Sequence, residues 1–231
     1  MEDFKLKFYT NFIADSRWKY ITEGLSTTFI VTICAALLGV AMGFLVAVVR
    51  STADRTGPKK GAVLTCADAV CRFYLTVIRG TPTMIQLLIM YYIVFTSPDI
   101  SKRFVAILAF GINSGAYVAE IVRSGIMSVD GGQLEAGRSL GLSYIQTMTH
   151  IIIPQAFRNI LPALANEFIT LLKETSICGY IALTDITHDA NVIGSQTYEP
   201  LMPLLAAALI YLILVSLLSM GVTKLERKLS C

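Results

Sequence analysis

Twenty-five consecutive residues without a charge, residues 25–49, constrain this chain more than any other feature. At about 1.5 Å per residue, a helix of that length exceeds the ~30 Å hydrocarbon core of a bilayer. A second uncharged run covers residues 201–222. Hydrophobic residues make up 55% of the 231 residues and charged residues 15%, against about 25% in soluble proteins. This composition excludes disorder, collagen, a coiled coil and a nucleic-acid-binding domain, and predicts an all-α integral membrane protein.

Five segments are candidates for membrane spans. The expected spans are residues 25–49, 73–95, 104–127, 156–178 and 201–222. Arg79-Gly80-Thr81-Pro82 interrupts the second of these, and the fourth has mediocre hydropathy because it contains four charged residues. Hydropathy alone therefore predicts four spans with a doubtful fifth.

The distribution of Lys and Arg predicts the orientation. Residues 50–72 contain five such residues, the tail after Val222 contains three, and residues 179–199 contain none. The positive-inside rule then places 50–72 and the C-terminus in the cytoplasm and 179–199 outside. The fourth segment must cross for this to hold, which gives a five-span helical core with its N-terminus outside. Four Lys/Arg residues in the N-terminal segment count against that orientation.

The N-terminal segment does not resemble a secretory signal, because acidic and basic residues are spread along it. Phe4, Phe8 and Phe12 recur at spacing four, which predicts an amphipathic helix in the membrane interface; the alternative is a frayed polar tail. The expected domains are this interfacial segment at 1–24, one transmembrane domain at 25–223 with a cytoplasmic loop at 128–155, and a cytoplasmic tail at 224–231.

Polar residues form stripes along two of the expected spans. Asn113, Tyr117 and Glu120 share one helical face, with Ser114 beside it, and a second polar face runs along 163–174. Ionisable groups in a membrane cost several kcal/mol unless they face water or a partner, so a shared wet cavity explains both faces. The candidate substrate-binding residues are Asn113, Ser114, Tyr117, Glu120, Asn166, Glu167 and Thr170.

Structural explanations compete with this cavity at some positions. Glu120 can pair with Arg123, three residues further along the helix. Arg79 can extend to the interface from a long tilted helix, or bond to backbone groups freed near Gly80 and Pro82; a structural role is favoured. Glu167 lies too far along its helix from the nearest basic residues for a direct bond, which favours a role in the cavity.

The loop at 128–155 contains the most specific motif. Gly131-Gly132 ends the preceding helix, and Gly141 would stop the next short helix by accepting a left-handed backbone. Ser143 followed by Gln146 predicts a capping box, and Pro154 predicts a break before the fourth span. Two short helices around a glycine corner suit the docking of a partner; the alternative is a loop that merely connects two spans.

The residues of this loop resemble those of a known family. Glu135-Ala136-Gly137, three residues, Gly141, nine residues and Ile151-Ile152-Ile153-Pro154 resemble the EAA loop of ABC-transporter permease subunits. That pattern reads E-A-A, three residues, G, nine residues, I-x-L-P, so Gly137 and Ile153 depart from it. Four further stretches resemble the polar-amino-acid branch of this family, and the similarity runs from about residue 20 to the end. They are residues 79–82, 113–120, 161–169 and 172–176.

The resemblance implies a permease subunit of an ATP-driven importer for polar amino acids in the bacterial plasma (inner) membrane, working by alternating access. It implies two ABC ATPase subunits, a second permease copy or paralogue, and an extracytoplasmic amino-acid-binding protein. Glu135, Ala136, Gly137 and Gly141 would couple this chain to the ATPase. ATP would be used by that partner, because the chain lacks the G-x-x-x-x-G-K-[ST] loop that cradles nucleotide phosphates.

Other classes fit less well. A self-sufficient secondary transporter or channel is the alternative, although the chain shows no internal repeat of the kind on which many such carriers are built. Neither H-E-x-x-H nor G-x-S-x-G occurs, so no catalytic residue is expected. The histidines His150 and His188 lie far apart and the five cysteines are scattered, so we expect no metal site, no disulfide framework and no bound cofactor.

The charge of Glu167 bears on the substrate. A carboxylate near mid-membrane depth is costly unless water or a cation compensates it. The amino group of any amino acid could do so, and so could the side chain of arginine, lysine or histidine. A cationic amino acid is therefore a candidate substrate, with glutamine as the main alternative.

Overall fold

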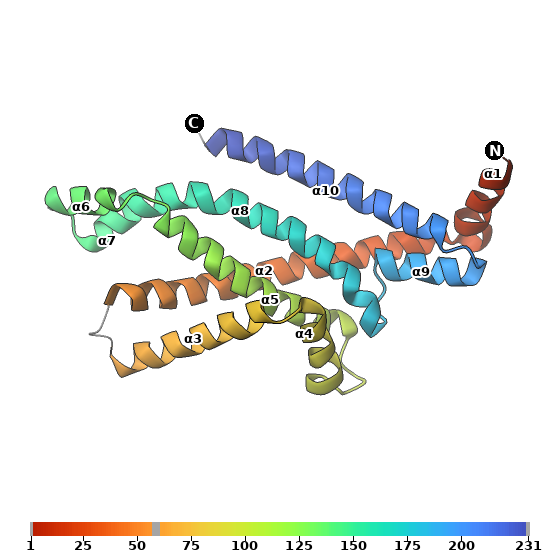
Figure 1. Ribbon diagram of the computed structural model, residues 1–231, viewed down its shortest axis with the longest axis horizontal. Helices are drawn as coiled ribbons and strands as arrows, with labels where there is room; N and C mark the ends of the chain where they lie inside the picture. Colours follow the sequence, from red (N-terminus) through yellow and green to blue (C-terminus); the bar gives the residue numbers. More distant parts are fainter. Residues whose placement is uncertain (1, 57–60, 230–231) are drawn as a thin grey trace. The chain divides into compact units, whose positions relative to one another are not determined.

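The computed structural model describes residues 2–56 and 61–229, and every regular element in these ranges is a helix (Figure 1). The predicted all-α class is confirmed. The elements are α1 (Glu2–Phe8), η1 (Tyr9–Ile13), η2 (Ala14–Ser16), α2 (Trp18–Thr56), α3 (Ala62–Gly80), α4 (Thr83–Ile89), η4 (Met90–Val94), α5 (Lys102–Met127), α6 (Gly131–Ser139), α7 (Tyr144–Thr147), η5 (Met148–Ile152), α8 (Ile153–Glu174), η6 (Thr175–Ile181), α9 (Ile186–Thr197) and α10 (Leu201–Leu229).

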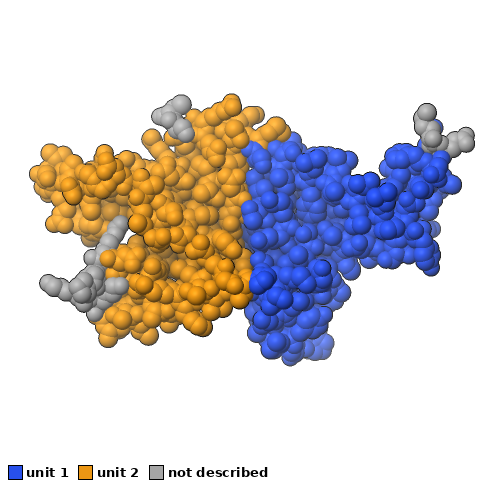
Figure 2. All heavy atoms as spheres, in the orientation of Figure 1, with its two compact units in different colours: residues 1–37, 82–111, 169–219 blue, residues 38–81, 112–168, 220–231 orange. Residues whose placement is uncertain are grey.

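The chain forms two compact units (Figure 2). Unit 1 comprises residues 1–37, 82–111 and 169–219; unit 2 comprises residues 38–81, 112–168 and 220–231. Four long helices, α2, α5, α8 and α10, contribute residues to both units. Each unit has its own buried apolar core, so each is described separately.

In unit 1, an apolar core joins residues from five elements. Val31, Leu87, Phe110, Leu171 and Ile181 are each at most 1% exposed and belong to α2, α4, α5, α8 and η6. A second cluster packs Ile186 and Ala190 of α9 against Ala207 of α10. Burying an aliphatic or aromatic side chain contributes about 1.5–3 kcal/mol, so these contacts hold the short helices of unit 1 to the long ones.

In unit 2, small residues let α2 and α5 approach closely. A Cβ atom on Gly43 would lie 2.6 Å from the Val118 side chain, and one on Gly39 would lie 2.9 Å from Ser114. Gly39 and Gly43 form a G-x-x-x-G pair, a pattern typical of closely packed membrane helices. Ala47, Val118, Val122, Ala156 and Ile160 form the apolar core there.

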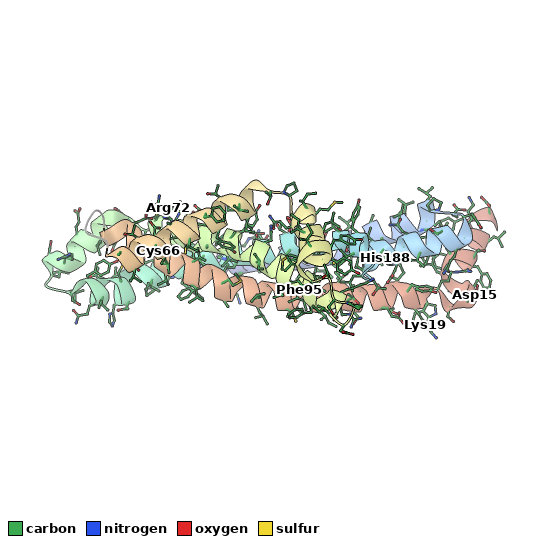
Figure 3. All side chains as sticks on the ribbon, turned by 90° about the horizontal axis from the view of Figure 1, so that it is seen from below. Asp15, Lys19, Cys66, Arg72, Phe95 and His188 are labelled. Carbon is green, nitrogen blue, oxygen red and sulfur yellow. The ribbon has the colours of Figure 1, made fainter. Side chains whose placement is uncertain are left out.

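An ion-pair network joins the C-terminal part of α2 to α3 within unit 2. Asp68 is 5% exposed, and its two carboxylate oxygens lie 2.6 Å from Arg50 Nη1 and 3.1 Å from Arg72 Nη2. Figure 3 shows Arg72 on α3. Two of the five basic residues behind the orientation prediction are thus paired with acids, while Lys59 and Lys60 lie outside the described residues.

The helices with the length and apolarity of a membrane span are α2, α5 and α10, within the part of the chain that the structure describes. The helix α2 begins before residue 25 and continues past 49, and α10 continues through residues 224–229, which we expected to form a tail. The helix α8 occupies the position of the doubtful segment 156–178 but does not meet the same criteria. The five-span core and the orientation of its ends stay predictions.

The apolar stretch 73–95 is not one helix. The helix α3 starts earlier, at Ala62, and ends at Gly80, because Thr81 and Pro82 both have extended backbones, with ψ of 146° and 136°. Proline disfavours helix at the residue before it, which explains the break. The pair α3 and α4 counts as one more span only if the two helices are taken as a single broken segment.

The N-terminal segment is helical and packs within unit 1. The Phe8 and Phe12 rings lie 5.2 Å apart. Asn11 is 1% exposed and accepts a 2.8 Å hydrogen bond from the Thr197 hydroxyl of α9. This anchoring contradicts a frayed tail, while a location in the membrane interface stays a prediction.

Two buried carboxyl groups lie near the start of α9, within the segment 179–199 and outside the expected spans. Asp185 is 0% exposed and caps α9 by accepting a 2.7 Å bond from the His188 backbone N–H. A Cβ on Gly24 would lie 2.6 Å from both the Asp185 carbonyl carbon and Asp189 Oδ2, so α2 needs glycine there. Burial, and to a smaller extent the Asp189 charge, raises the pKa of Asp185 from 3.8 to about 7.

This raised pKa predicts a pH-dependent stability. Since folded Asp185 holds its proton more tightly than the unfolded chain does, its burial costs more stability as pH rises from about 4 to about 7. Asp185→Asn keeps a capping oxygen and cannot ionise. We expect its melting temperature in detergent to exceed the wild type by about 5 °C at pH 8 and to match it at pH 4. The exposed control Asp99→Asn should have the melting temperature of the wild type at both pH values. A difference in melting temperature between Asp185→Asn and the wild type that is the same at pH 4 and pH 8 would contradict the raised pKa.

The topology can be tested with two matched cysteine substitutions. Ser139 and Ser195 are exposed, and each hydroxyl bonds back to a carbonyl of its own helix. In a chain without its natural cysteines, Ser139→Cys should react with an impermeant thiol reagent only in inverted vesicles and Ser195→Cys only in intact cells. Labelling of both from the same side would contradict a crossing by α8.

Candidate functional site

The loop after α5 folds into the two short helices that the sequence predicts (Figure 1). The Asp130 side chain caps α6 by accepting a 2.9 Å bond from the Gly132 backbone N–H. Gly141 has φ of +85°, which is the left-handed corner expected there. Ser143 and Gln146 form the predicted capping box at α7, with bonds of 2.8 and 3.3 Å.

Gly137 has a packing role in this loop. It is buried in α6, and a Cβ atom there would lie 2.5 Å from Thr147 Cγ2. The other three predicted coupling residues, Glu135, Ala136 and Gly141, are exposed. Gly137 therefore holds α6 against the helix that begins with α7, and the exposed residues are the ones that remain accessible to a partner.

Two features of this loop differ from the sequence prediction. Pro154 does not mark a break, because α7, η5 and α8 run from Tyr144 to Glu174 without interruption and Pro154 lies in the first turn of α8. The helix changes its hydrogen-bonding pattern directly before Pro154, in the π-helical segment η5, rather than ending there. The side chains of Leu140 and Ile145, which the motif does not include, are 83% and 71% exposed and give the loop an apolar surface.

A hydrogen bond joins the two polar stripes within unit 2. The Ser114 hydroxyl of α5 donates to Glu167 Oε1 of α8 at 2.9 Å, and Ser114 is 1% exposed. The predicted meeting of the two polar faces is thus observed at this pair. Ser114 comes so close to α2 because position 39 carries no side chain.

A cavity of about 390 Å³ lies beside this pair, also within unit 2, and we call it the Glu167 cavity. Tyr117, Glu120 and Glu167 line it, as the stripes predict. The full lining consists of Arg79, Tyr117, Glu120, Ile121, Ser124, Gly125, Ser128, Asn159, Ala163 and Glu167. Ligand cavities commonly have volumes of about 300–1,000 Å³, so a small polar molecule fits this one.

Four of the predicted substrate-binding residues do not line this cavity, and Ser114, which bonds to Glu167, is one of them. Asn113 is buried at 2% exposure, and Asn166 is an exposed residue of α8. Thr170 is exposed and belongs to unit 1. The stripe along α8 therefore reaches the cavity through Glu167 and the residues before it.

Arg79 is the main lining residue that sequence reasoning did not assign. Its Nη1 lies 3.4 Å from Glu120 Oε2, and its guanidinium lies 5.8 Å from the centroid of the Tyr117 ring. Arg79 therefore makes contacts with α5 that neither of the expected structural roles includes. Glu120 also pairs with Arg123 at 2.6 Å, as its spacing predicts.

Asn159 was also missed, although a signal existed. Asn159, Ala163 and Glu167 follow one another at spacing four, so they share a face of α8. The Asn159 amide donates to the Ser128 hydroxyl at 2.8 Å. For metals, the described residues contain no group of three or more His, Cys, Asp or Glu side chains that could hold an ion.

Comparisons with known proteins place the chain in a family. Residues 65–230 match the family described as binding-protein-dependent transport system inner membrane component. The chain is 38% identical over 212 residues to the arginine transport system permease protein ArtQ of Bacillus subtilis, covering 91% of this chain and 92% of that protein. It is 35% identical over 231 residues to a putative glutamine transport system permease protein GlnP of Rickettsia typhi, covering 99% of both.

A solved structure agrees with these matches. The crystal structure of an amino acid ABC transporter with histidines has a TM-score of 0.83 and 37% identity to this chain, covering 94% of this chain and 98% of that one. The chain therefore belongs to the binding-protein-dependent transport system inner membrane components, and it is a multi-pass inner-membrane permease.

Proposed function

We propose that this chain is the membrane-spanning permease subunit of an ATP-driven importer for polar amino acids, and that its substrate passes through the Glu167 cavity. The observation that carries the proposal is a carboxylate among membrane helices whose partner is the neutral hydroxyl of Ser114. Such a group is costly without water or a cation beside it. Substrate passage explains why the cost is tolerated.

The names of the relatives support an amino-acid substrate. Permeases for arginine and for glutamine are similar along nearly the whole chain, and both substrates carry an α-amino group that can bind a carboxylate. Asn159, Ser124 and Ser128 add neutral hydrogen-bonding groups to the cavity. These groups suit a polar side chain.

The loop of α6 and α7 is the proposed docking site for a separate ATPase. Its exposed residues Glu135, Ala136 and Gly141 would make the contacts, together with the apolar surface of Leu140 and Ile145. ATP hydrolysis then takes place on that partner. Two ATPase copies, a second permease copy or paralogue and an extracytoplasmic binding protein complete the proposed assembly, in which the cavity would open alternately to each side of the membrane.

A self-sufficient secondary transporter or channel is not favoured. The similar proteins named above are a permease protein of an arginine transport system, one of a glutamine transport system, and an ABC transporter. A shaped docking loop is also unnecessary in a carrier that works alone.

The substitution Glu167→Gln tests the proposed substrate site. It keeps the shape of the side chain and removes the charge that would bind a substrate amino group. In a reconstituted complex with ATPase and binding protein, amino-acid uptake should fall more than tenfold, while basal ATP turnover persists. A tenfold fall corresponds to a loss of about 1.4 kcal/mol of stabilisation of the bound substrate. The exposed control Glu226→Gln on α10 should transport normally. Unchanged uptake for Glu167→Gln across a panel of amino acids would remove the cavity from the transport path.

The docking loop makes a separate prediction. Gly137→Ala brings a methyl group into Thr147, and overpacking of this kind costs about 1–3 kcal/mol. We expect less ATPase to be retained in a detergent pull-down, and expect Thr147→Ala to restore retention in the double variant. Gly131→Ala is the matched control, because nothing lies within 4 Å of its new Cβ. Equal retention by all three variants would show that the packing of α6 does not matter for docking.

A further inference from the structure

The positive and negative side chains around the Glu167 cavity are not paired one to one. Arg123 makes the shorter contacts with Glu120, 2.6 and 3.3 Å from its two carboxylate oxygens. Arg79 reaches the same carboxylate at 3.4 Å, and its side chain is 42% exposed. Two guanidinium groups thus share one carboxylate, which leaves one positive charge in excess at the Arg79 end of the cavity.

An excess negative charge lies at the other end of the cavity, at Glu167. Glu167 accepts a bond from Ser114, and among the described residues the ion pairs do not include it. With Glu167 ionised, the cavity has one surplus negative charge and one surplus positive charge, at two separate places. A free α-amino acid has the complementary arrangement, since it carries a carboxylate and an ammonium group on one carbon atom.

We propose that Arg79 binds the α-carboxylate of the substrate and Glu167 its α-ammonium group. This inference rests on the proposed function, because it takes the Glu167 cavity as the substrate site. A guanidinium binds a carboxylate through two parallel N–H donors, so Arg79 also orients its ligand. The Tyr117 ring beside Arg79 helps to hold the guanidinium in place.

The two charges face the same space. Arg79 and Glu167 both line the Glu167 cavity, and its volume of about 390 Å³ accommodates a free amino acid.

The same pairing predicts the class of amino acid. The carboxylates that line the cavity are Glu120 and Glu167, within the described part of the chain. Arg123 neutralises Glu120, and the α-ammonium group of the substrate neutralises Glu167. A second positive charge on the substrate would then lack a partner, so the site selects a neutral polar amino acid over arginine, lysine or histidine.

The test measures binding of L-glutamine, L-glutamine α-methyl ester and L-arginine to the purified permease–ATPase complex without the binding protein, which could impose its own selectivity. The wild type should bind glutamine at least tenfold more tightly than the ester, which lacks the carboxylate charge, and more tightly than arginine. Arg79→Gln should weaken the binding of glutamine to the level of the ester, so that the two ligands bind with equal affinity. Arg79→Lys should restore part of that difference, and the exposed control Arg158→Gln should behave as the wild type.

The outcomes separate this inference from the proposed function. If Glu167→Gln abolishes binding but Arg79→Gln leaves the ratio of glutamine to ester unchanged, the cavity stands as the substrate site and the role of Arg79 is overturned. Tighter binding of arginine than of glutamine to the wild type overturns the predicted class. If none of these ligands binds in a way that depends on Glu167, the proposed substrate site itself fails. If the role of Arg79 is purely structural, Arg79→Gln would weaken the binding of glutamine and of the ester by the same factor, which also overturns the inference.

Discussion

The cost of placing carboxylates among membrane helices governs the arrangement of unit 2. The chain meets this cost in two ways on neighbouring helices. Glu120 is neutralised by Arg123 on its own helix, while Arg79 from α3 approaches the same carboxylate at 3.4 Å. Glu167 instead has a hydroxyl partner and an adjacent cavity. The first solution is structural, and the second leaves a charge that a ligand can use.

Small residues make this arrangement possible. Gly39 and Gly43 bring α2 against α5, which places Ser114 where its hydroxyl reaches Glu167. In the loop, Gly137 performs a similar function by letting α6 lie against Thr147. A side chain at any of these positions would separate two helices and move the polar group that depends on them.

Local patterns predicted much of this structure. The helical period placed Tyr117 and Glu120 on the cavity face of α5, and glycine's tolerance of positive φ predicted the corner at Gly141. Non-local contacts could not be predicted in this way. Arg79 meets Glu120 across 41 residues of sequence, and Gly137 meets Thr147 on another helix. Pro154 was misjudged because the helix continues through it, with the π-helical segment η5 directly before it.

A structure of the assembled transporter, determined by electron cryo-microscopy with a saturating neutral amino acid such as glutamine, tests the substrate site most directly. The amino acid should lie in the Glu167 cavity, with its ammonium group within 3.2 Å of the Glu167 carboxylate, a normal hydrogen-bond distance. Density for the amino acid elsewhere in the membrane domain, with water alone beside Glu167, would contradict the assignment.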